Sequence, residues 1–376
     1  MNFDFSDDEK LVRDQTARLL TDRCPISVVR QVLEGDTVYA KEVWAGLVEM
    51  GLTATSVPEA YGGVEAGYLT LCLVAEQLGA GLAPTPFSSS VYLAIEALLA
   101  FGSEAQKERW LPKLASGELI GTLAVVESGN ELTPDSVQLN ATNGRLSGSK
   151  LLVPDGNIAD VCVVIARASA PDSGAGLSMY LADLRTGSVA RESVETVDPT
   201  RDSASLEFAD CEAEVLGAAG AGWDQLERLY DRAAILISFE QLGGAQSALD
   251  MAVAYAKERF AFGRPIGSFQ ALKHMMADMY VALKLAESNC YYAAWALATN
   301  ADDLPLAAAT ARVSATQAYQ LCTRDNIQVH GGMGFTWEFD CHLYYRRSNY
   351  LALQLGGLTT WENKLVNALP RDEAAA

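Results

Sequence analysis

Two polar side chains flank a tight turn inside a stretch that is otherwise helical in pattern. Arg259 precedes the turn at residues 263–265, which reads Gly-Arg-Pro, and Gln270 follows it. A Gly-Arg-Pro turn between two helical patterns is first of all a structural break. With a permanent cation on one side and an amide on the other, the same turn could present both groups to a bound anion or ring. Residues 255–279 are therefore the candidate functional stretch.

Long helical patterns position this stretch. Alanine- and leucine-rich periodicity covers residues 223–259, 269–300, 304–330 and 344–368, broken only at 263–265, 302–305 and 331–334. Four long helices with short connections predict a four-helix bundle.

The first 120 residues also read as helical. Ser6 stands where a capping residue precedes a periodic apolar run. Further helices are expected over residues 40–50, where Gly51 ends the pattern, and over 69–79, 91–101 and 106–114. The segment 57–63 is too rich in glycine and proline for a regular element.

A different period appears between these helical parts. Short β-type runs at 123–126, 137–141, 161–165, 179–181 and 205–208 are separated by turn residues at 143–144, 155–156 and 172–174. Such strands predict a small sandwich or barrel. The expected fold class is mainly α with a central β domain: an N-terminal helical domain (1–120), a β domain (121–215) and a C-terminal helical bundle (216–376).

The charge balance restricts the partners. The 48 acidic and 28 basic residues give a formal net charge of −20. A surface of this sign repels phosphate backbones and anionic lipids, so neither nucleic acid nor membrane is expected as a partner.

Cysteine and histidine usage argues against a metal site. The seven cysteines form no Cys-x-x-Cys pair, and the three histidines have no metal-ligand spacing. The scattered cysteines suit reduced thiols, and the first residues have no signal-peptide core, so a cytoplasmic protein without metal is expected.

Five stretches carry a resemblance to a known family. They are VPEAYGG (57–63), GSEAQKERWLPKLASGE (102–118), VLGAAGAGW (215–223), the stretch 255–279 and QVHGGMGFTWE (328–338). In this order and spacing, over the whole length, the chain resembles an acyl-CoA dehydrogenase. The resemblance implies FAD wedged between the β domain and the bundle, and tetramers in which a neighbouring subunit completes each FAD site.

The resemblance also gives roles to residues of the bundle. Arg259 resembles the arginine that meets the FAD diphosphate of a neighbouring chain, for which a planar charged fork is suited. Phe262 and Gln270 resemble residues that hold the adenosine half, and Gln328 and Gly332 match residues that approach the same cofactor. The alternatives are a salt bridge at a helix end for Arg259 and ordinary turn glycines after residue 330.

In the β domain the chain departs from the family pattern. Where the family has Thr-Glu-Pro against the flavin ring, residues 125–129 read VVESG, so Val126 replaces a threonine. Thr133 is aligned with a family serine near the diphosphate, and Pro154 ends LVP where the family often has Trp-x-Thr. Backbone N–H groups can still bind the flavin edge, because they do not depend on the side chain.

The catalytic base is the larger departure. The family reaction removes an α-proton from an acyl thioester while hydride leaves the β-carbon for the flavin, so it needs a carboxylate. Relatives carry the glutamate at one of two positions. In the first, near the C-terminus, this chain has Leu355-Gly356-Gly357, where the glycine is retained and the glutamate is absent, and in the second it has Ala233. Glu240 lies two helical turns after Ala233 on the same face, within an apolar stretch. It is the candidate base; the alternative is a buried acid paired with a bundle arginine or with a helix end.

Three functions remain open at this point. The first is FAD-dependent dehydrogenation of an acyl-CoA to a trans-2-enoyl-CoA, with electrons passed to an electron-transfer flavoprotein, by a homotetramer or an α2β2 heterotetramer. The second is a partner subunit that shares FAD sites and lacks its own base. The third is a flavin-binding relative without catalysis. The sequence does not identify the acyl group, although Leu355 and two following glycines would leave room for a bulky one.

Overall fold

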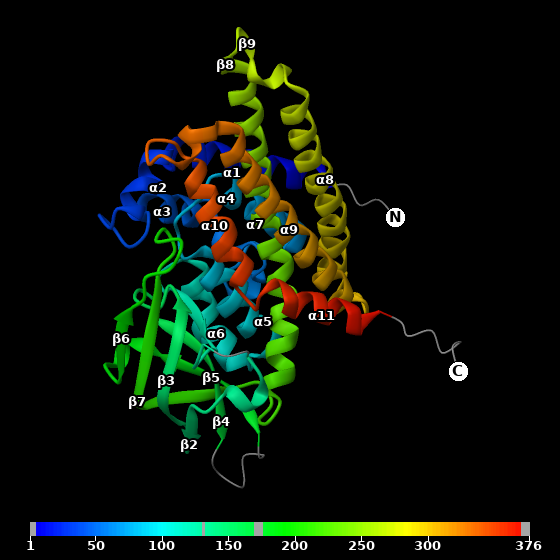
Figure 1. Ribbon diagram of the computed structural model, residues 1–376. Helices are drawn as coiled ribbons and strands as arrows, with labels where there is room; N and C mark the ends of the chain where they lie inside the picture. The colour runs from blue at the N-terminus through cyan, green and yellow to red at the C-terminus, as the bar shows by residue number, and fades with distance from the viewer. Residues whose placement is uncertain (1–4, 130–131, 169–175, 370–376) are drawn as a thin grey trace. The chain divides into compact units, whose positions relative to one another are not determined.

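The computed structural model describes residues 5–129, 132–168 and 176–369. The predicted order of helical part, β part and helical bundle is confirmed (Figure 1). By its internal contacts the chain forms two compact units: unit 1 holds residues 1–21, 68–83 and 234–376, and unit 2 holds 22–67 and 84–233. The three domain boundaries expected from the sequence stay a prediction.

The N-terminal part is helical throughout, as expected. Ser6 caps the first helix, since its Oγ accepts from the Glu9 N–H (3.3 Å) while the Ser6 N–H donates to the Glu9 carboxylate (2.6 Å). The pattern at 91–101 begins as a π-helix, Ser88–Ile95. One helix, Ile26–Leu33, was not predicted. The helices are α1 Asp7–Arg23, α2 Ile26–Leu33, α3 Lys41–Glu49, α4 Gly67–Ala80, α5 Glu96–Phe101 and α6 Glu104–Ala115.

The β part of unit 2 closes on itself. Strand β4 pairs with β2 on one side and β5 on the other, and the path β4-β2-β3-β7-β5 returns to β4. A ring of paired strands is the barrel alternative of the sequence prediction. The strands are β1 Gly121–Ala124, β2 Asn140–Thr142, β3 Arg145–Pro154, β4 Val161–Ala168, β5 Leu177–Asp183, β6 Val189–Ser193 and β7 Ser203–Leu216.

Two details of the β prediction needed correction. The strand expected at 137–141 begins at Asn140, because Val137 still ends a short 3-10 turn. Strand β6 was missed. The turn at Asn143 and Gly144, with φ of 51° and 73°, joins β2 to β3 as predicted. The turn expected at 172–174 lies outside the described residues.

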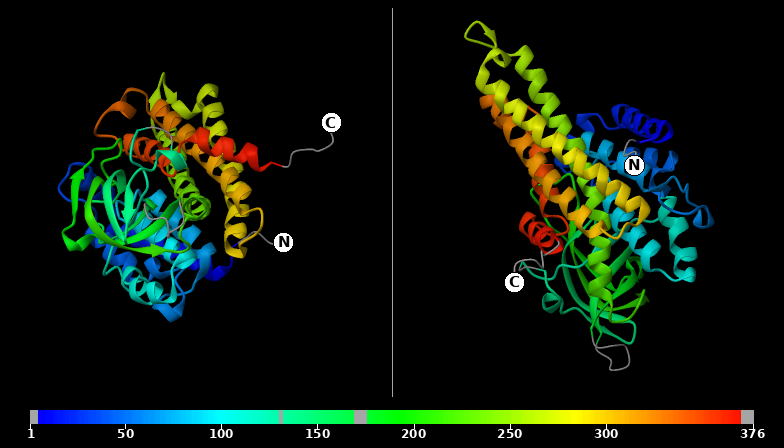
Figure 2. Two further views of the ribbon diagram at one scale, coloured as in Figure 1. Left: turned by 90° about the horizontal axis from the view of Figure 1, so that it is seen from below. Right: turned by 90° about the vertical axis from the view of Figure 1, so that its right-hand side faces the viewer.

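Long helices build unit 1, and α8 and α9 lie side by side along their length (Figure 2). The expected helices at 223–259, 269–300 and 304–330 are observed, but the single helix expected at 344–368 is wrong. Leu355 and Gly356 take φ of 58° and 98°, so the chain breaks there into two helices. The elements are α7 Gly222–Glu258, β8 Phe260–Ala261, β9 Arg264–Pro265, α8 Gln270–Thr299, α9 Leu304–His330, α10 Cys341–Leu353 and α11 Leu358–Ala368.

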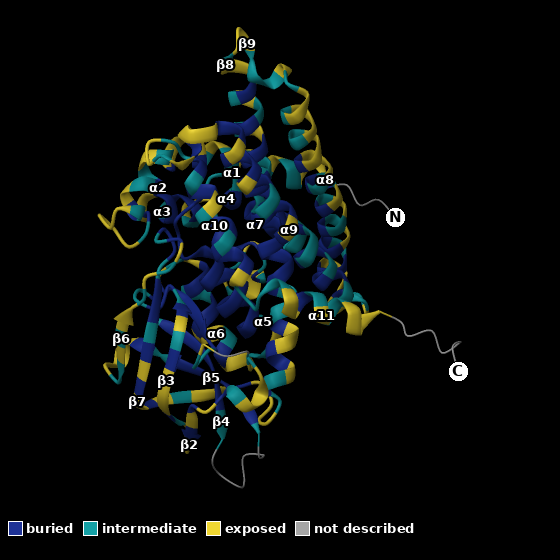
Figure 3. Ribbon diagram, viewed as in Figure 1, coloured by how far each residue is buried: buried dark blue, intermediate teal, exposed yellow. Residues whose placement is uncertain are grey.

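Within unit 1, α4 and the later part of α7 approach closely. A Cβ on Gly79 would lie 1.8 Å from the backbone oxygen of Glu240, and one on Gly243 would lie 1.8 Å from that of Glu76. Only glycine permits backbones to cross at this distance. The middle of α7 is accordingly buried along its length (Figure 3). This crossing places Glu240 in the core of the unit.

Three further observations concern the described residues. None of their helices is sufficiently long and apolar for a membrane span. They contain no group of histidine, cysteine and acidic side chains arranged to hold a metal ion. All seven cysteines are buried free thiols.

Candidate active site

The stretch that opened the sequence prediction forms a β-hairpin at one end of unit 1 (Figure 1). Helix α7 ends at Glu258, and strands β8 and β9 are joined by Phe262 and Gly263 with φ of 52° and 78°. Two consecutive positive φ values define the tight turn that matches strand twist. A phenylalanine seldom adopts this conformation, and here it leaves 95% of its side chain exposed. The hairpin thus presents an aromatic ring outward.

Contacts at the base of the hairpin leave Arg259 open. The Ile266 N–H donates to the Arg259 carbonyl (2.8 Å), and the Arg264 guanidinium lies over the Phe269 ring (4.1 Å). The exposed Arg259 side chain makes no ion pair with any residue that the structure describes. The alternative of a helix-end salt bridge is therefore not observed, and the guanidinium is available to an anion.

Gln270, the amide of the sequence prediction, begins α8 directly after the hairpin. It is exposed, and its Nε2 lies 3.4 Å from the Nε2 of His274 one turn later. The structure therefore keeps Arg259, Phe262 and Gln270 on one short, exposed segment.

The end of α9 meets the end of α7, which the sequence did not reveal. The rings of Tyr255 and His330 stack with centroids 4.0 Å apart, and Phe339 packs edge-on against both. His330 Nδ1 lies 2.9 Å from the Asn326 carbonyl, and burial lowers the pKa of this imidazole. This aromatic contact connects α7, the helix that leads into the hairpin, to the glycine-rich segment after His330.

That segment carries the two remaining bundle residues. Gln328 and Gly332 are both exposed. A Cβ built on Gly332 would meet no heavy atom within 4 Å, so nothing described in the chain fills the space beside it. The aromatic cluster thus brings Gln328 and Gly332 to the helix end that carries Arg259.

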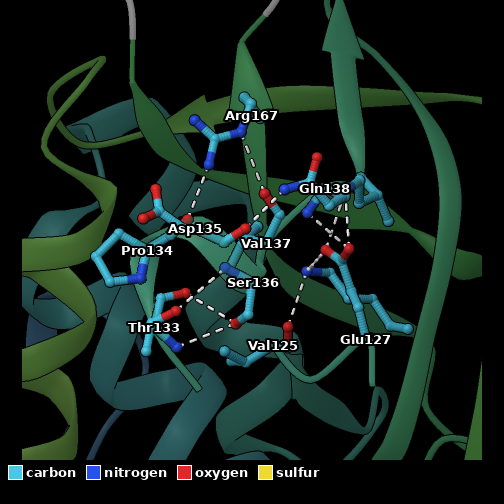
Figure 4. A network of polar contacts seen from close by, with 11 residues as sticks. Val125, Glu127, Thr133, Pro134, Asp135, Ser136, Val137, Gln138 and Arg167 are labelled. Atoms are coloured by element: carbon cyan, nitrogen blue, oxygen red, sulfur yellow. Dashed lines mark hydrogen bonds and ion pairs between the residues drawn. The ribbon is translucent and has the colours of Figure 1, made fainter. Parts of the chain in front are cut away.

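In unit 2 the segment expected at the flavin is fixed by an ion pair between Lys150 and Glu127, whose side chains are 0% and 11% exposed. Figure 4 shows Val125 and Glu127 of this segment within a wider polar network. Lys150 Nζ donates to the Val125 carbonyl (2.9 Å) and to the Glu127 carboxylate (2.6 Å), and Lys150 is fully buried. Burial lowers the pKa of Lys150, while Glu127 opposes this shift. Val126 is held between these anchors, and its carbonyl accepts from the Leu151 N–H (2.7 Å).

Thr133, another β-domain candidate, lies in the same network. Thr133 caps a 3-10 turn, accepting from the Ser136 N–H (3.3 Å), and the chain after it donates through the Gln138 N–H to Glu127 (2.7 Å). Arg167 ties this turn to β4 through the Pro134 and Val137 carbonyls (Figure 4).

Pro154 ends β3, three residues after Leu151, and accepts from the Thr122 hydroxyl (2.5 Å). The structure thus groups Val126, Thr133 and Pro154 around β3 and the segment that follows β1. The ion pair of Lys150 was missed, because a lysine in a strand gives no sign of a distant carboxylate.

Glu240 is paired in the core of unit 1. Its side chain and that of Arg347 are 1% and 0% exposed, and Arg347 Nη1 lies 3.5 Å from Glu240 Oε1. Arg347 also donates to the Leu82 carbonyl (3.3 Å). These contacts favour the alternative weighed from the sequence, a buried acid paired with a bundle arginine.

Residues 6–118 match the family model described as acyl-CoA dehydrogenase, N-terminal domain, and residues 220–357 match the acyl-CoA dehydrogenase C-terminal domain. The chain belongs to the acyl-CoA dehydrogenase family, whose members are FAD-dependent oxidoreductases acting on acyl-CoA.

Three relatives show how far the similarity extends. The chain is 33% identical to acyl-CoA dehydrogenase IpdE2 of Mycobacterium tuberculosis, over 91% of each chain. It shares a TM-score of 0.88 and 25% identity with butyryl-CoA dehydrogenase of Megasphaera elsdenii, covering 99% of this chain and 100% of that one. A chain of the ChsE4–ChsE5 complex of M. tuberculosis gives a TM-score of 0.88 and 27% identity at the same coverage.

The residues of unit 1 fit FAD. A diphosphate needs a cation that is not already neutralised, and Arg259 provides one. An adenine ring needs an aromatic or apolar surface, and Phe262 exposes almost its whole ring. The open space beside Gly332 admits close approach of a ligand to the backbone. When bound, FAD supplies the redox chemistry of the family.

Proposed function

We propose that this chain takes part in α,β-dehydrogenation of an acyl-CoA thioester to a trans-2-enoyl-CoA, with electrons passed to an electron-transfer flavoprotein. The exposed hairpin end of unit 1 carries this proposal. Its unneutralised arginine and its outward phenylalanine would contact the FAD of a neighbouring subunit. Exposing an aromatic ring on a strained turn is unfavourable for an isolated chain, and such features mark contact sites. Assembly is therefore part of the proposed function.

In unit 2 the proposed flavin contact is made by the segment around Val126. The Lys150–Glu127 pair fixes the backbone on both sides of this residue, so its position does not depend on the missing threonine hydroxyl. Thr133, whose turn contacts Glu127, and Pro154, which ends β3, are also proposed as neighbours of the cofactor. Gln270, Gln328 and the glycine at 332 complete the proposed contacts from unit 1.

The source of the catalytic base separates two forms of the proposal. In the first, Glu240 abstracts the α-proton, which requires its release from Arg347. In the second, a partner subunit supplies the base, and this chain contributes FAD-binding surface to an α2β2 assembly. The buried pairing of Glu240 favours the second form. The similarity to a chain of the ChsE4–ChsE5 complex, which contains two different proteins, supports it as well.

The cytoplasm is the proposed location. Seven buried free thiols suit a reducing compartment. The acyl group is proposed to be bulky, because Leu355, Gly356 and Gly357 stand where relatives carry a larger acid-bearing segment. A substrate panel in which short straight chains react faster than ring-bearing ones would contradict this size preference.

The test is purification of the chain alone and after co-expression with proteins encoded beside it, with flavin content and subunit mass measured together. We expect a yellow assembly whose flavin absorbance falls when an acyl-CoA is added without oxygen. Bleaching by the homomeric protein supports the first form, and bleaching only in a mixed assembly supports the second. Bound flavin that no acyl-CoA bleaches in either preparation would reject dehydrogenation.

A further inference from the structure

A second arginine is buried in unit 1, and it contacts only uncharged oxygens. Arg312, in the middle of α9, is 1% exposed. Its guanidinium donates to the Gln241 side-chain oxygen (2.7 Å), to the Leu351 carbonyl and to the Gln354 carbonyl (2.8 Å). Gln241 is itself fixed by Thr316 of α9, whose Oγ1 lies 3.1 Å from the Gln241 Nε2. The guanidinium is therefore held rigidly between α7, α9 and the end of α10.

The charge of Arg312 is balanced by a helix end. No carboxylate among the described residues forms an ion pair with it, unlike the buried Arg347, which has Glu240. Leu351 belongs to the last turn of α10, and Gln354 follows the helix directly. The carbonyls of a helix C-terminus carry partial negative charge and lack partners within the helix. The Arg312 guanidinium both compensates this partial negative charge and donates hydrogen bonds to the carbonyls that lack partners. Burial lowers its pKa to about 9, so the cation persists at neutral pH.

The segment after α10 has a strained backbone at Leu355, and a second buried donor holds it there. Leu355 takes a φ of 58°, an unfavourable conformation for a residue with a branched side chain. The indole N–H of the buried Trp361, on α11, donates to the Leu355 carbonyl (3.1 Å). Two buried donors from different helices thus fix the carbonyls of consecutive residues. Strain of this kind persists only where the surroundings impose it.

We propose that Arg312 is a positioning residue: it fixes the C-terminal carbonyls of α10 and thereby the turn at 354–357, in which Leu355 and Gly356 are left-handed. The proposal rests on the proposed function, in which this turn stands where relatives place the acid beside the acyl thioester. Here the turn has no acid, so its role is to shape the wall of that pocket. A planar, permanently charged fork suits two carbonyls and an amide, whereas a lysine would reach fewer of them.

Amide hydrogen exchange of the full chain, in its assembly, tests the positioning directly. Arg312→Met is expected to speed amide exchange in the last turn of α10, residues 350–354, by about tenfold or more, because the bonds from Arg312 to the Leu351 and Gln354 carbonyls that hold this helix end are lost. Arg312→Lys should give a smaller increase. Trp361→Phe keeps the ring packing and removes the indole N–H, so it should speed exchange at the amides of residues 360 and 361, which donate to the Gly357 carbonyl, and spare α10. Arg324→Met, in the same helix but 66% exposed, is the matched control and should change nothing at the turn.

Unchanged exchange at residues 350–354 in a folded Arg312→Met protein would overturn the proposal. So would an increase spread evenly over unit 1, which indicates a general loss of stability. If Arg312→Met does not fold, the Lys and Phe variants decide, and no local increase in either of them rejects it.

A second readout concerns the substrate. With butyryl-CoA and a ring-bearing acyl-CoA, we expect Arg312→Lys to raise KM at least tenfold at unchanged FAD content, and Arg324→Met to leave it unchanged. An unaltered KM contradicts the role at the pocket. If no acyl-CoA is turned over by the unmodified assembly, the proposed function fails, and the exchange result still decides whether Arg312 fixes the turn.

Discussion

Replacing either partner of the buried pair of Glu240 and Arg347 should lower the free energy of unfolding strongly. Both side chains are almost fully buried, with a nitrogen–oxygen distance of 3.5 Å. Removing one partner of such a pair typically costs about 3–5 kcal/mol, because a charge remains buried without compensation. At about 2–4 °C per kcal/mol for a unit of this size, Glu240→Gln and Arg347→Met should each lower Tm by roughly 6–20 °C.

The double variant shows whether the two charges depend on each other. With both removed, no uncompensated charge remains, so its loss should be smaller than the sum of the single losses by at least about 2 kcal/mol. Thermal and urea unfolding of the four proteins measure this difference. Arg324→Met removes an arginine whose side chain is 66% exposed beside Asp325, and it should cost no more than about 1 kcal/mol. Additive losses, or a neutral Glu240→Gln, would refute the structural role of the pair.

The same variants decide between the two sources of the base. If Glu240 is the base, Glu240→Gln retains FAD and loses turnover, and Arg347→Met added to it restores none. If the pair is structural, the double variant recovers both stability and turnover in the assembly. Turnover in a folded Glu240→Gln protein equal to that of the unmodified one also rejects Glu240 as the base.

Four further predictions concern single residues. Burial raises the pKa of Glu76 from 4.5 to about 7, so the native state holds a proton that the unfolded chain releases, and stability should fall as pH rises between these values. Glu76→Gln removes this loss, and its Tm relative to the unmodified protein should therefore be higher at about pH 8 than at about pH 5. Gly243→Ala should cost roughly 3 kcal/mol in urea unfolding, because its Cβ meets backbone at 1.8 Å. Gly332→Ala, with open space around its Cβ, should keep the same stability and lower only flavin retention. Lys150→Met should cost about 3 kcal/mol by leaving Glu127 without its cation, and adding Glu127→Gln should recover most of it; equal losses in both proteins would contradict the ion pair.

Local patterns predicted much of the helical architecture. The helix expected at 304–330 is observed with those bounds, since alanine-rich periodicity and breaks at both ends agree. The capping box at Ser6 was likewise visible as Ser-x-x-Glu. The break after α10 was missed, because two glycines in an apolar pattern do not reveal that Leu355 takes a left-handed conformation. That conformation depends on donors from α9 and α11, which are distant in sequence.

The candidate site was predictable to a different extent. Motif spacing pointed to the exposed residues of the hairpin and to the glycines after α9, and the structure places both at one end of unit 1. The partners of buried charges could not be predicted. Three buried cations show this: Lys150, Arg312 and Arg347. The apolar periodicity around each of them indicates only that the residue is buried. It does not indicate which group the side chain contacts, because that group belongs to another element. For the same reason the sequence could not decide whether Glu240 is a base or one half of an ion pair.

We propose that this chain binds FAD and acts on acyl-CoA as part of an assembly. The most direct measurement is the anaerobic titration of the assembled protein with an acyl-CoA, comparing Arg259→Gln with the unmodified chain. The account predicts a flavin-containing oligomer that bleaches, and a variant that folds but loses most of its flavin. A protein that retains no flavin, alone or with any partner, or an Arg259→Gln variant that retains flavin in full, would contradict it.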